Sequence, residues 1–176
     1  LAHRWYSRIF DEVKGLLFKD GGPIIAVQVE NELTDDARHL LDLKHLAQEV
    51  GFDVPLYTVT GWNSRYGAKI PVDDVLPVFG AYVDAPWAET LDRLPPSPHF
   101  VFSPVRNDAA IGMDQSTAAP EDGWLLPYDR YPFATCELGS GLQATHHRRM
   151  IVSPQDAYAL SLVKLGSGNN LVGYYM

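Results

Sequence analysis

The chain has 176 residues, of which 46% are hydrophobic and 20% charged, and its formal net charge is −8. This composition predicts a globular domain with a sizeable core, and the acidic balance argues against nucleic acid as a partner because phosphate binding needs a basic surface. No apolar run approaches the roughly 18 residues of a membrane-spanning helix, so no membrane partner is expected. Cys136 is the single cysteine, which excludes an intrachain disulfide.

The first predicted element is an amphipathic helix that the Asp20-Gly21-Gly22-Pro23 turn stops. Its hydrophobic face is spaced by three and four residues and consists of Trp5, Ile9, Val13, Leu16 and Leu17. Ile24–Val29 predicts a short buried strand, because nearly all of its residues are apolar. Thr34 predicts the N-cap of a second helix, which ends at Gly51.

The second half predicts further strands and one more helix. The predicted strands are Pro55–Thr60, Val75–Ala81, Phe133–Cys136 and Leu171–Tyr175, with a short strand at Phe100–Phe102 inside the long stretch Trp87–Arg130. Ser153 predicts the N-cap of the last helix, with Pro154 at N1 and Asp156 at N3. Alternation of strands and helices is typical of a parallel sheet with crossover helices, here with five main strands in a single domain of residues 1–176.

Two glutamates follow strand-like runs in separate motifs, Glu32 in GGPIIAVQVENEL and Glu137 in FATCELGSG. Two carboxylates that project from the ends of different strands toward one site are what glycoside hydrolysis requires. Strand alternation places Glu30 on the same side as Glu32, so either carboxylate could be the general acid. Considered by spacing alone, the pattern is explained equally well by structural acids at strand exits.

Several segments together carry a family resemblance. GGPIIAVQVENEL, LYTVTGWN, LPVFGAYVDAPW, VFSPVRND, TCELGSG, HHRR and LVGYYM resemble, in this order, the β-galactosidases of glycoside hydrolase family 35. The resemblance implies a (β/α)₈ TIM barrel of the retaining clan A, here an incomplete C-terminal part that covers about strands 4–8. It also implies that Glu32 is the general acid/base and Glu137 the nucleophile.

The resemblance assigns further residues to the sugar site. Asn31 is expected to bind the sugar 2-hydroxyl, with Glu30 beside it, and Tyr175 either faces the galactose site or belongs to the core. Trp62 and Trp87 follow predicted strands, where an indole can stack on a sugar or anchor a packed loop.

The sequence also departs from the family pattern. Leu33 and Thr34 follow the acid/base glutamate where a tyrosine is frequent, and Gly139 stands where some members carry a tyrosine after the nucleophile. Asp84 could bind a sugar hydroxyl or cap a turn. The run His146-His147-Arg148-Arg149 lacks the spacing of a metal site, so neither a metal nor a cofactor is expected.

The sequence thus predicts a retaining hydrolase of carbohydrate metabolism that releases terminal β-D-galactose from an oligosaccharide or glycoconjugate. Retention predicts about 5–5.5 Å between the two carboxyl groups. One alternative is a β-glucosaminidase or another clan A β-glycosidase, and a second is an inert fragment that lacks strands 1–3. The isolated chain is expected to be inactive, and its exposed strand edges are expected to associate with the missing barrel segment or with another copy. The cellular compartment stays open.

Overall fold

The computed structural model describes residues 1–33, 36–59, 70–71, 73–84, 88, 90–92, 94, 97–102, 130–139, 145–146 and 148–175. The helices are α1 (Ala2–Val13), α2 (Ala37–Val50) and α3 (Pro154–Gly166), and two short 3-10 turns are η1 (Phe18–Asp20) and η2 (Pro98–Phe100). The strands are β1 (Val27–Glu30), β2 (Leu56–Val59), β3 (Leu76–Tyr82), β4 (Ala134–Gly139) and β5 (Leu171–Tyr175).

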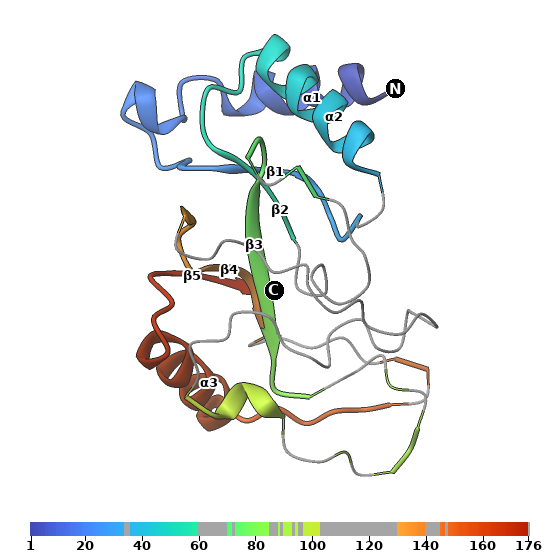
Figure 1. The fold of residues 1–176 in the computed structure, drawn as a ribbon, viewed down its shortest axis with the longest axis vertical. Coiled ribbons are helices and arrows are strands. Elements are labelled where there is room, and N and C mark those ends of the chain that lie inside the picture. Colours follow the sequence, from blue (N-terminus) through green and yellow to red (C-terminus); the bar gives the residue numbers. More distant parts are fainter. Residues whose placement is uncertain are drawn as a thin grey trace.

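All five strands form one parallel sheet in the order β1-β2-β3-β4-β5. The predicted parallel sheet is therefore confirmed, and each strand pairs with the next strand along the chain. Figure 1 shows that the sheet curls, with α1 and α2 beside β1 at one end and α3 beside β4 and β5 at the other. The result is a half-barrel whose carboxyl strand ends share one edge.

The hydrophobic core lies between the sheet and the helices. One cluster packs the β1 end of the sheet against α2, and its buried members are Leu17, Val29, Leu43, Ala47, Phe52, Leu56 and Val75. In a second cluster, Ala81 and Leu138 pack against Leu160 of α3. Tyr82 and Glu137, which directly neighbour Ala81 and Leu138 along their strands, are only partly buried.

The predicted hydrophobic face of the first helix is correct only in part: Val13 packs against the core cluster and Leu17, beyond the end of α1, is buried. Trp5 and Ile9 are 60% and 46% exposed, whereas Tyr6 and Phe10 pack edge-on against Phe52. The two stripes are offset by one residue and both satisfy the helical period, so only the position of the neighbouring elements selects between them. The helix also ends at Val13, well before the predicted turn.

Other boundaries differ from prediction for local reasons. β1 begins at Val27 rather than Ile24, because Ile24 forms an isolated bridge with Leu17. Asp36, not Thr34, is the N-cap of α2, since its carboxylate accepts the His39 backbone N–H at 2.9 Å. Thr34 itself lies outside the described residues. The predicted strand at 100–102 is absent, because Phe100 ends η2.

The last helix and strand match prediction. Ser153 and Asp156 form a reciprocal capping box at the start of α3, with proline in the first turn. β5 has the predicted bounds, and Gly51 ends α2 in the left-handed conformation that favours glycine.

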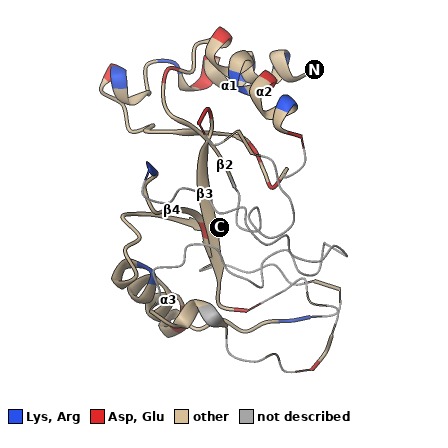
Figure 2. Cartoon of the chain, viewed as in Figure 1, with Lys and Arg blue, Asp and Glu red and all other residues tan. Residues whose placement is uncertain are grey.

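Acidic and basic residues are interspersed along α1 and α2 (Figure 2). Exposed pairs such as Arg38 with Asp42 and Lys19 with Asp53 contribute little stability each. Among the described residues, no helix combines the length and the apolar character needed to cross a bilayer.

Candidate active site

Register shifts occur in the two strands whose motifs carry the candidate catalytic glutamates. Between Gln28 and Glu30, β1 advances two residues while β2 advances one, and β4 carries an extra residue against both β3 and β5 between Thr135 and Leu138. The β2–β3 pair, which carries neither glutamate, is regular. A bulge changes the direction of a side chain near a strand end, so simple alternation could not predict where these glutamates point.

Glu137 lies within β4 and is held by a tyrosine from the neighbouring strand. The Tyr82 hydroxyl at the end of β3 donates a hydrogen bond to the Glu137 carboxylate. Burial first, and then this hydrogen bond, raise the pKa of Tyr82 far above its usual value of 10.0, so the phenol keeps its proton. A protonated phenol donates to the carboxylate and fixes its orientation, and a nucleophile must be held in a defined orientation toward the carbon that it attacks.

Glu32 lies two residues beyond the end of β1, in a different backbone setting. Its φ of 62° is the only positive value recorded for a non-glycine residue in the described part of the chain. Glutamate enters this left-handed region at a cost of order 1–3 kcal/mol, and such residues cluster at functional sites. The side chain is partly exposed, as a group that exchanges protons with substrate and water must be.

The charges of Glu32 and Glu137 act on the same two groups. Both raise the pKa of Tyr82, after burial and the hydrogen bond, and together with burial, the largest cause, both raise the pKa of Cys136 to about 12. Electrostatic coupling of this kind requires proximity, since charge interactions fade over about a Debye length of 10 Å at 0.1 M salt. The ends of β1 and β4 therefore present two carboxylates to one region.

Besides Tyr82, aromatic side chains of β2 and β5 lie near Glu137. Tyr175 of β5 packs edge-on against Tyr82 with ring centroids 5.9 Å apart, and burial followed by the charges of Cys136 and Glu137 raises the pKa of Tyr57 on β2. Tyr175 is thus placed beside the nucleophile candidate. The phenols supply hydroxyl donors and ring faces, which suit a sugar with alternating hydroxyl and C–H surfaces.

Gly139 explains how the site forms without the tyrosine that some family members carry there. A Cβ at position 139 would lie 2.7 Å from Cδ1 of Tyr82, a distance that forces the ring to move. The absence of a side chain lets the Tyr82 ring lie against the β4 backbone and reach Glu137.

Asn31 has its amide orientation set by another side chain. Gln28 donates from Nε2 to Oδ1 of Asn31 at 2.8 Å and to the backbone carbonyl of Glu30 at 3.1 Å. Because the Asn31 oxygen accepts this bond, its NH₂ group is the part presented to a ligand. Asn31 is exposed.

The Glu30 side chain acts on a group outside this region. Among the described groups with a resolved shift, its charge raises the pKa of Tyr6 on α1, after burial, and it is not a cause of the shift at Tyr82. Glu32, and not Glu30, is a cause of the raised pKa of Tyr82 and Cys136, to which Glu137 also contributes. The role of Glu30 in substrate binding stays a prediction.

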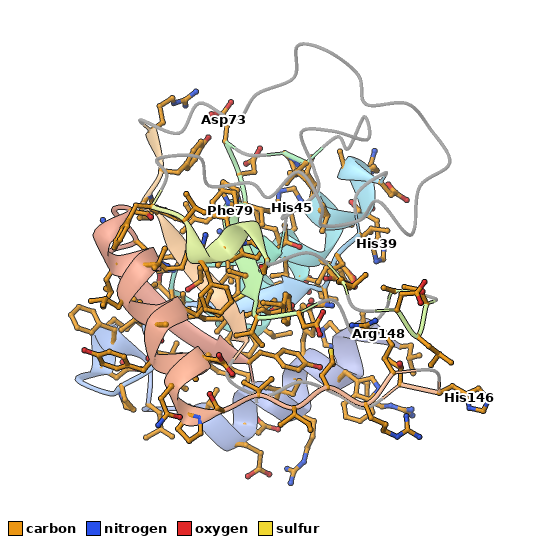
Figure 3. All side chains as sticks on the ribbon, turned by 90° about the horizontal axis from the view of Figure 1, so that it is seen from below. His39, His45, Asp73, Phe79, His146 and Arg148 are labelled. Carbon is orange, nitrogen blue, oxygen red and sulfur yellow. The ribbon has the colours of Figure 1, made fainter. Side chains whose placement is uncertain are left out.

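The remaining residues that the sequence suggested are not described as part of this region. Trp62 and Trp87 lie outside the described residues. His146 lies at the periphery of the molecule, away from His39 and His45 of α2 (Figure 3), and no group of three or more potential metal ligands occurs among the described residues. Asp84 forms an ion pair with Arg148 at 3.1 Å.

Sequence reasoning missed Tyr82, Gln28 and the pairing of Arg148. Tyr82 reads as an ordinary core aromatic in LPVFGAYV, although its place at the end of a strand adjacent to TCE is a signal that could have found it. Gln28 and Arg148 gave no comparable signal, because their partners are set by backbone geometry.

Comparison with known proteins identifies the family. The family model for glycosyl hydrolases family 35 matches residues 1–176. The chain belongs to this family. Family 35 members are glycoside hydrolases, and the two carboxylates at the ends of β1 and β4 are consistent with that membership.

Curated relatives agree with this assignment over part of the chain. Beta-galactosidase 8 of Oryza sativa subsp. japonica is 40% identical over 65 residues, and Beta-galactosidase of Bos taurus is 42% identical over 67; each match covers 35% of this chain and 10% of the relative. Beta-galactosidase 17 of Arabidopsis thaliana is 36% identical over 81 residues, which cover 43% of this chain and 12% of the relative. The matches thus span about a tenth of the length of these relatives.

Proposed function

We propose that this chain carries the catalytic carboxylates of a retaining β-galactosidase, with Glu137 as nucleophile and Glu32 as general acid/base. The observation that carries the proposal is the convergence of the two charges on Tyr82, one of them through a direct hydrogen bond. The five strands then correspond to strands 4–8 of a TIM barrel, and the chain to the C-terminal part of one catalytic domain. Strands 1–3 would complete the pocket.

Each carboxylate has the setting its step requires. Glu137 attacks the anomeric carbon and displaces the aglycone, and Glu32 gives its proton to the departing glycosidic oxygen. Water then attacks the galactosyl–Glu137 ester, Glu32 removes the proton from that water, and galactose leaves with its β configuration retained. Asn31 donates from its NH₂ group to the sugar 2-hydroxyl, and the Tyr82 hydroxyl orients the Glu137 carboxylate.

The nucleophile can be tested by covalent trapping. A preparation that hydrolyses 4-nitrophenyl β-galactoside is inactivated with 2-deoxy-2-fluoro-β-galactosyl fluoride and digested, and the labelled peptide is sequenced by mass spectrometry. We expect the label on Glu137 and protection by free galactose. A label on Glu30 or Glu32, or inactivation without a covalent adduct, contradicts the assignment.

The sugar is tested by a panel of aryl glycosides with the same leaving group. We expect the highest kcat/KM for β-galactoside. A preference for β-glucosaminide would keep the carboxylate chemistry and change the substrate, whereas a protein that includes strands 1–3 and acts on none of the glycosides would contradict the proposed function.

A further inference from the structure

Arg148 connects the loop that follows β3 to the segment that follows β4. Its side chain is only 9% exposed, although arginine is rarely buried unless it is paired. Nη2 donates to both carboxylate oxygens of Asp84, at 3.2 and 3.1 Å. Nη1 donates to the backbone carbonyls of Thr90 and Asp92, each at 3.0 Å. One guanidinium therefore holds both ends of the 84–92 segment.

The backbone on either side of this contact is also fixed. The Arg148 N–H donates to the Thr145 hydroxyl at 3.1 Å, and the Thr145 N–H donates to the Arg148 carbonyl at 3.0 Å. On the other side, the Ser97 hydroxyl donates to the Tyr82 carbonyl at 2.9 Å. The chain is thus held on both sides of the segment that leaves Tyr82.

The position of Asp84 gives the ion pair a link to the candidate active site. Asp84 follows Tyr82 by two residues, and Tyr82 donates to Glu137. Arg148 follows Glu137 on the same chain. Figure 3 shows Arg148 beside the ribbon while its neighbour His146 points outward. The guanidinium is therefore linked to Glu137 through its bonds to Asp84, the short chain from Asp84 back to Tyr82, and the Tyr82 hydrogen bond.

We infer that Arg148 is a positioning residue that fixes Tyr82 against Glu137 by holding the 84–92 segment. The inference rests on the proposed function for its kinetic test. It assigns a role to a residue whose sequence context, HHRR, suggested only a cluster of ligands. Arginine suits this role because its planar group distributes donors over two nitrogens, which a lysine ammonium cannot reproduce.

The decisive experiment is a double-mutant cycle between Arg148→Gln and Tyr82→Phe, measured as kcat/KM on an aryl β-galactoside. If Arg148 acts through the Tyr82 hydroxyl, its loss lowers kcat/KM about tenfold in the wild-type background and less than about threefold when that hydroxyl is already absent. An equal loss in both backgrounds would show a merely structural role and overturn the inference. Arg149→Gln, which removes the exposed neighbouring charge, is the matched control, and an equal loss there would also overturn it.

Two further measurements cover the cases in which this cycle fails. If Arg148→Gln does not fold, Arg148→Lys keeps the charge and loses the distributed donors, and the same non-additivity with Tyr82→Phe is expected. If the wild-type protein that includes strands 1–3 hydrolyses no glycoside, the proposed function is wrong, but the inference about Arg148 can still be tested. The ¹⁹F resonance of 3-fluorotyrosine at position 82, assigned by its loss in Tyr82→Phe, then decides: a shift in Arg148→Lys but not in Arg149→Lys supports the inference, and no shift overturns it.

Discussion

The ends of β1 and β4 present chemically identical carboxylates in opposite ways. Glu137 lies inside β4, and the Tyr82 hydroxyl binds it directly. Glu32 lies beyond the end of β1, has a left-handed backbone conformation and is partly exposed. Each strand carries a bulge beside its motif. A bulge is common to both strands and therefore does not distinguish the two candidate roles. Glu137, the nucleophile candidate, accepts a hydrogen bond from a protonated phenol, whereas Glu32, the acid/base candidate, lies on the segment that follows its strand.

The largest expected effect is at the β4 end. Glu137→Gln removes the nucleophile and should lower kcat about 10⁴-fold or more, by analogy with the loss of other nucleophiles. Steady-state kinetics on 4-nitrophenyl β-galactoside measures this loss. Azide should restore turnover of Glu137→Ala and yield the α-galactosyl azide. Near-normal turnover in Glu137→Gln would show that Glu137 is not the nucleophile.

The β1 end should respond according to the leaving group. Glu32→Gln should lower kcat/KM about 10²- to 10⁴-fold for alkyl galactosides, which need a general acid, and far less for 2,4-dinitrophenyl galactoside, which does not. Comparison with Glu30→Gln separates the two neighbouring carboxylates. A loss in Glu30→Gln as large and as dependent on the leaving group would move the acid/base role to that residue.

The contact that distinguishes the two ends is the Tyr82 hydroxyl. Tyr82→Phe removes one charge-assisted donor while keeping the ring, and it should lower kcat about 10²-fold. Because the pKa of Tyr82 is raised, the hydroxyl stays protonated, and the wild-type pH profile should show no loss of activity from phenol ionisation below pH 10. The exposed Tyr158→Phe is the control. A tyrosine titration in the profile below pH 10 would contradict this prediction.

A smaller effect is expected from the residue that orients Asn31. Gln28→Leu leaves the Asn31 amide free to rotate and should weaken recognition of the sugar 2-hydroxyl about 3- to 10-fold, the worth of one hydrogen bond. The ratio of kcat/KM for a galactoside to kcat/KM for the corresponding 2-deoxygalactoside should fall by the same factor. Gln48→Leu, on the exposed face of α2, serves as control. If this ratio is unchanged in Gln28→Leu, Gln28 has no part in recognition of the sugar 2-hydroxyl.

The smallest effect concerns Cys136, which neighbours Glu137. Burial and the two carboxylates raise its pKa to about 12, so little thiolate is present at pH 8. Alkylation by iodoacetamide at that pH should be roughly a thousandfold slower than in the unfolded chain, and should accelerate as the pH rises toward 12. Mass spectrometry of timed samples measures the rate. Rapid labelling of the folded protein at neutral pH would show that the β4 end is more open than described.

Much of the architecture was predictable because it depends on local chemistry. The capping box of α3, the glycine that ends α2 and the strand-helix alternation each depend on residues near one another in sequence. Boundaries failed where a distant partner intervened, as at Ile24, which bridges to Leu17. The packing of Trp5 and Ile9 on α1 was predicted wrongly, because two stripes of apolar residues fit the same helical period and the contacts with Phe52 decide between them.

The candidate site divides in the same way. The sequence by itself determined the family, the parallel sheet and the identity of Glu32 and Glu137 as the candidate carboxylates, since motifs and periodicity are properties of contiguous residues. Only the tertiary structure decided that Tyr82 donates to Glu137, that Gln28 holds Asn31 and that Arg148 pairs with Asp84. These contacts join residues whose separation is set by strand register and bulges, and a single extra residue in a strand changes where every later side chain points.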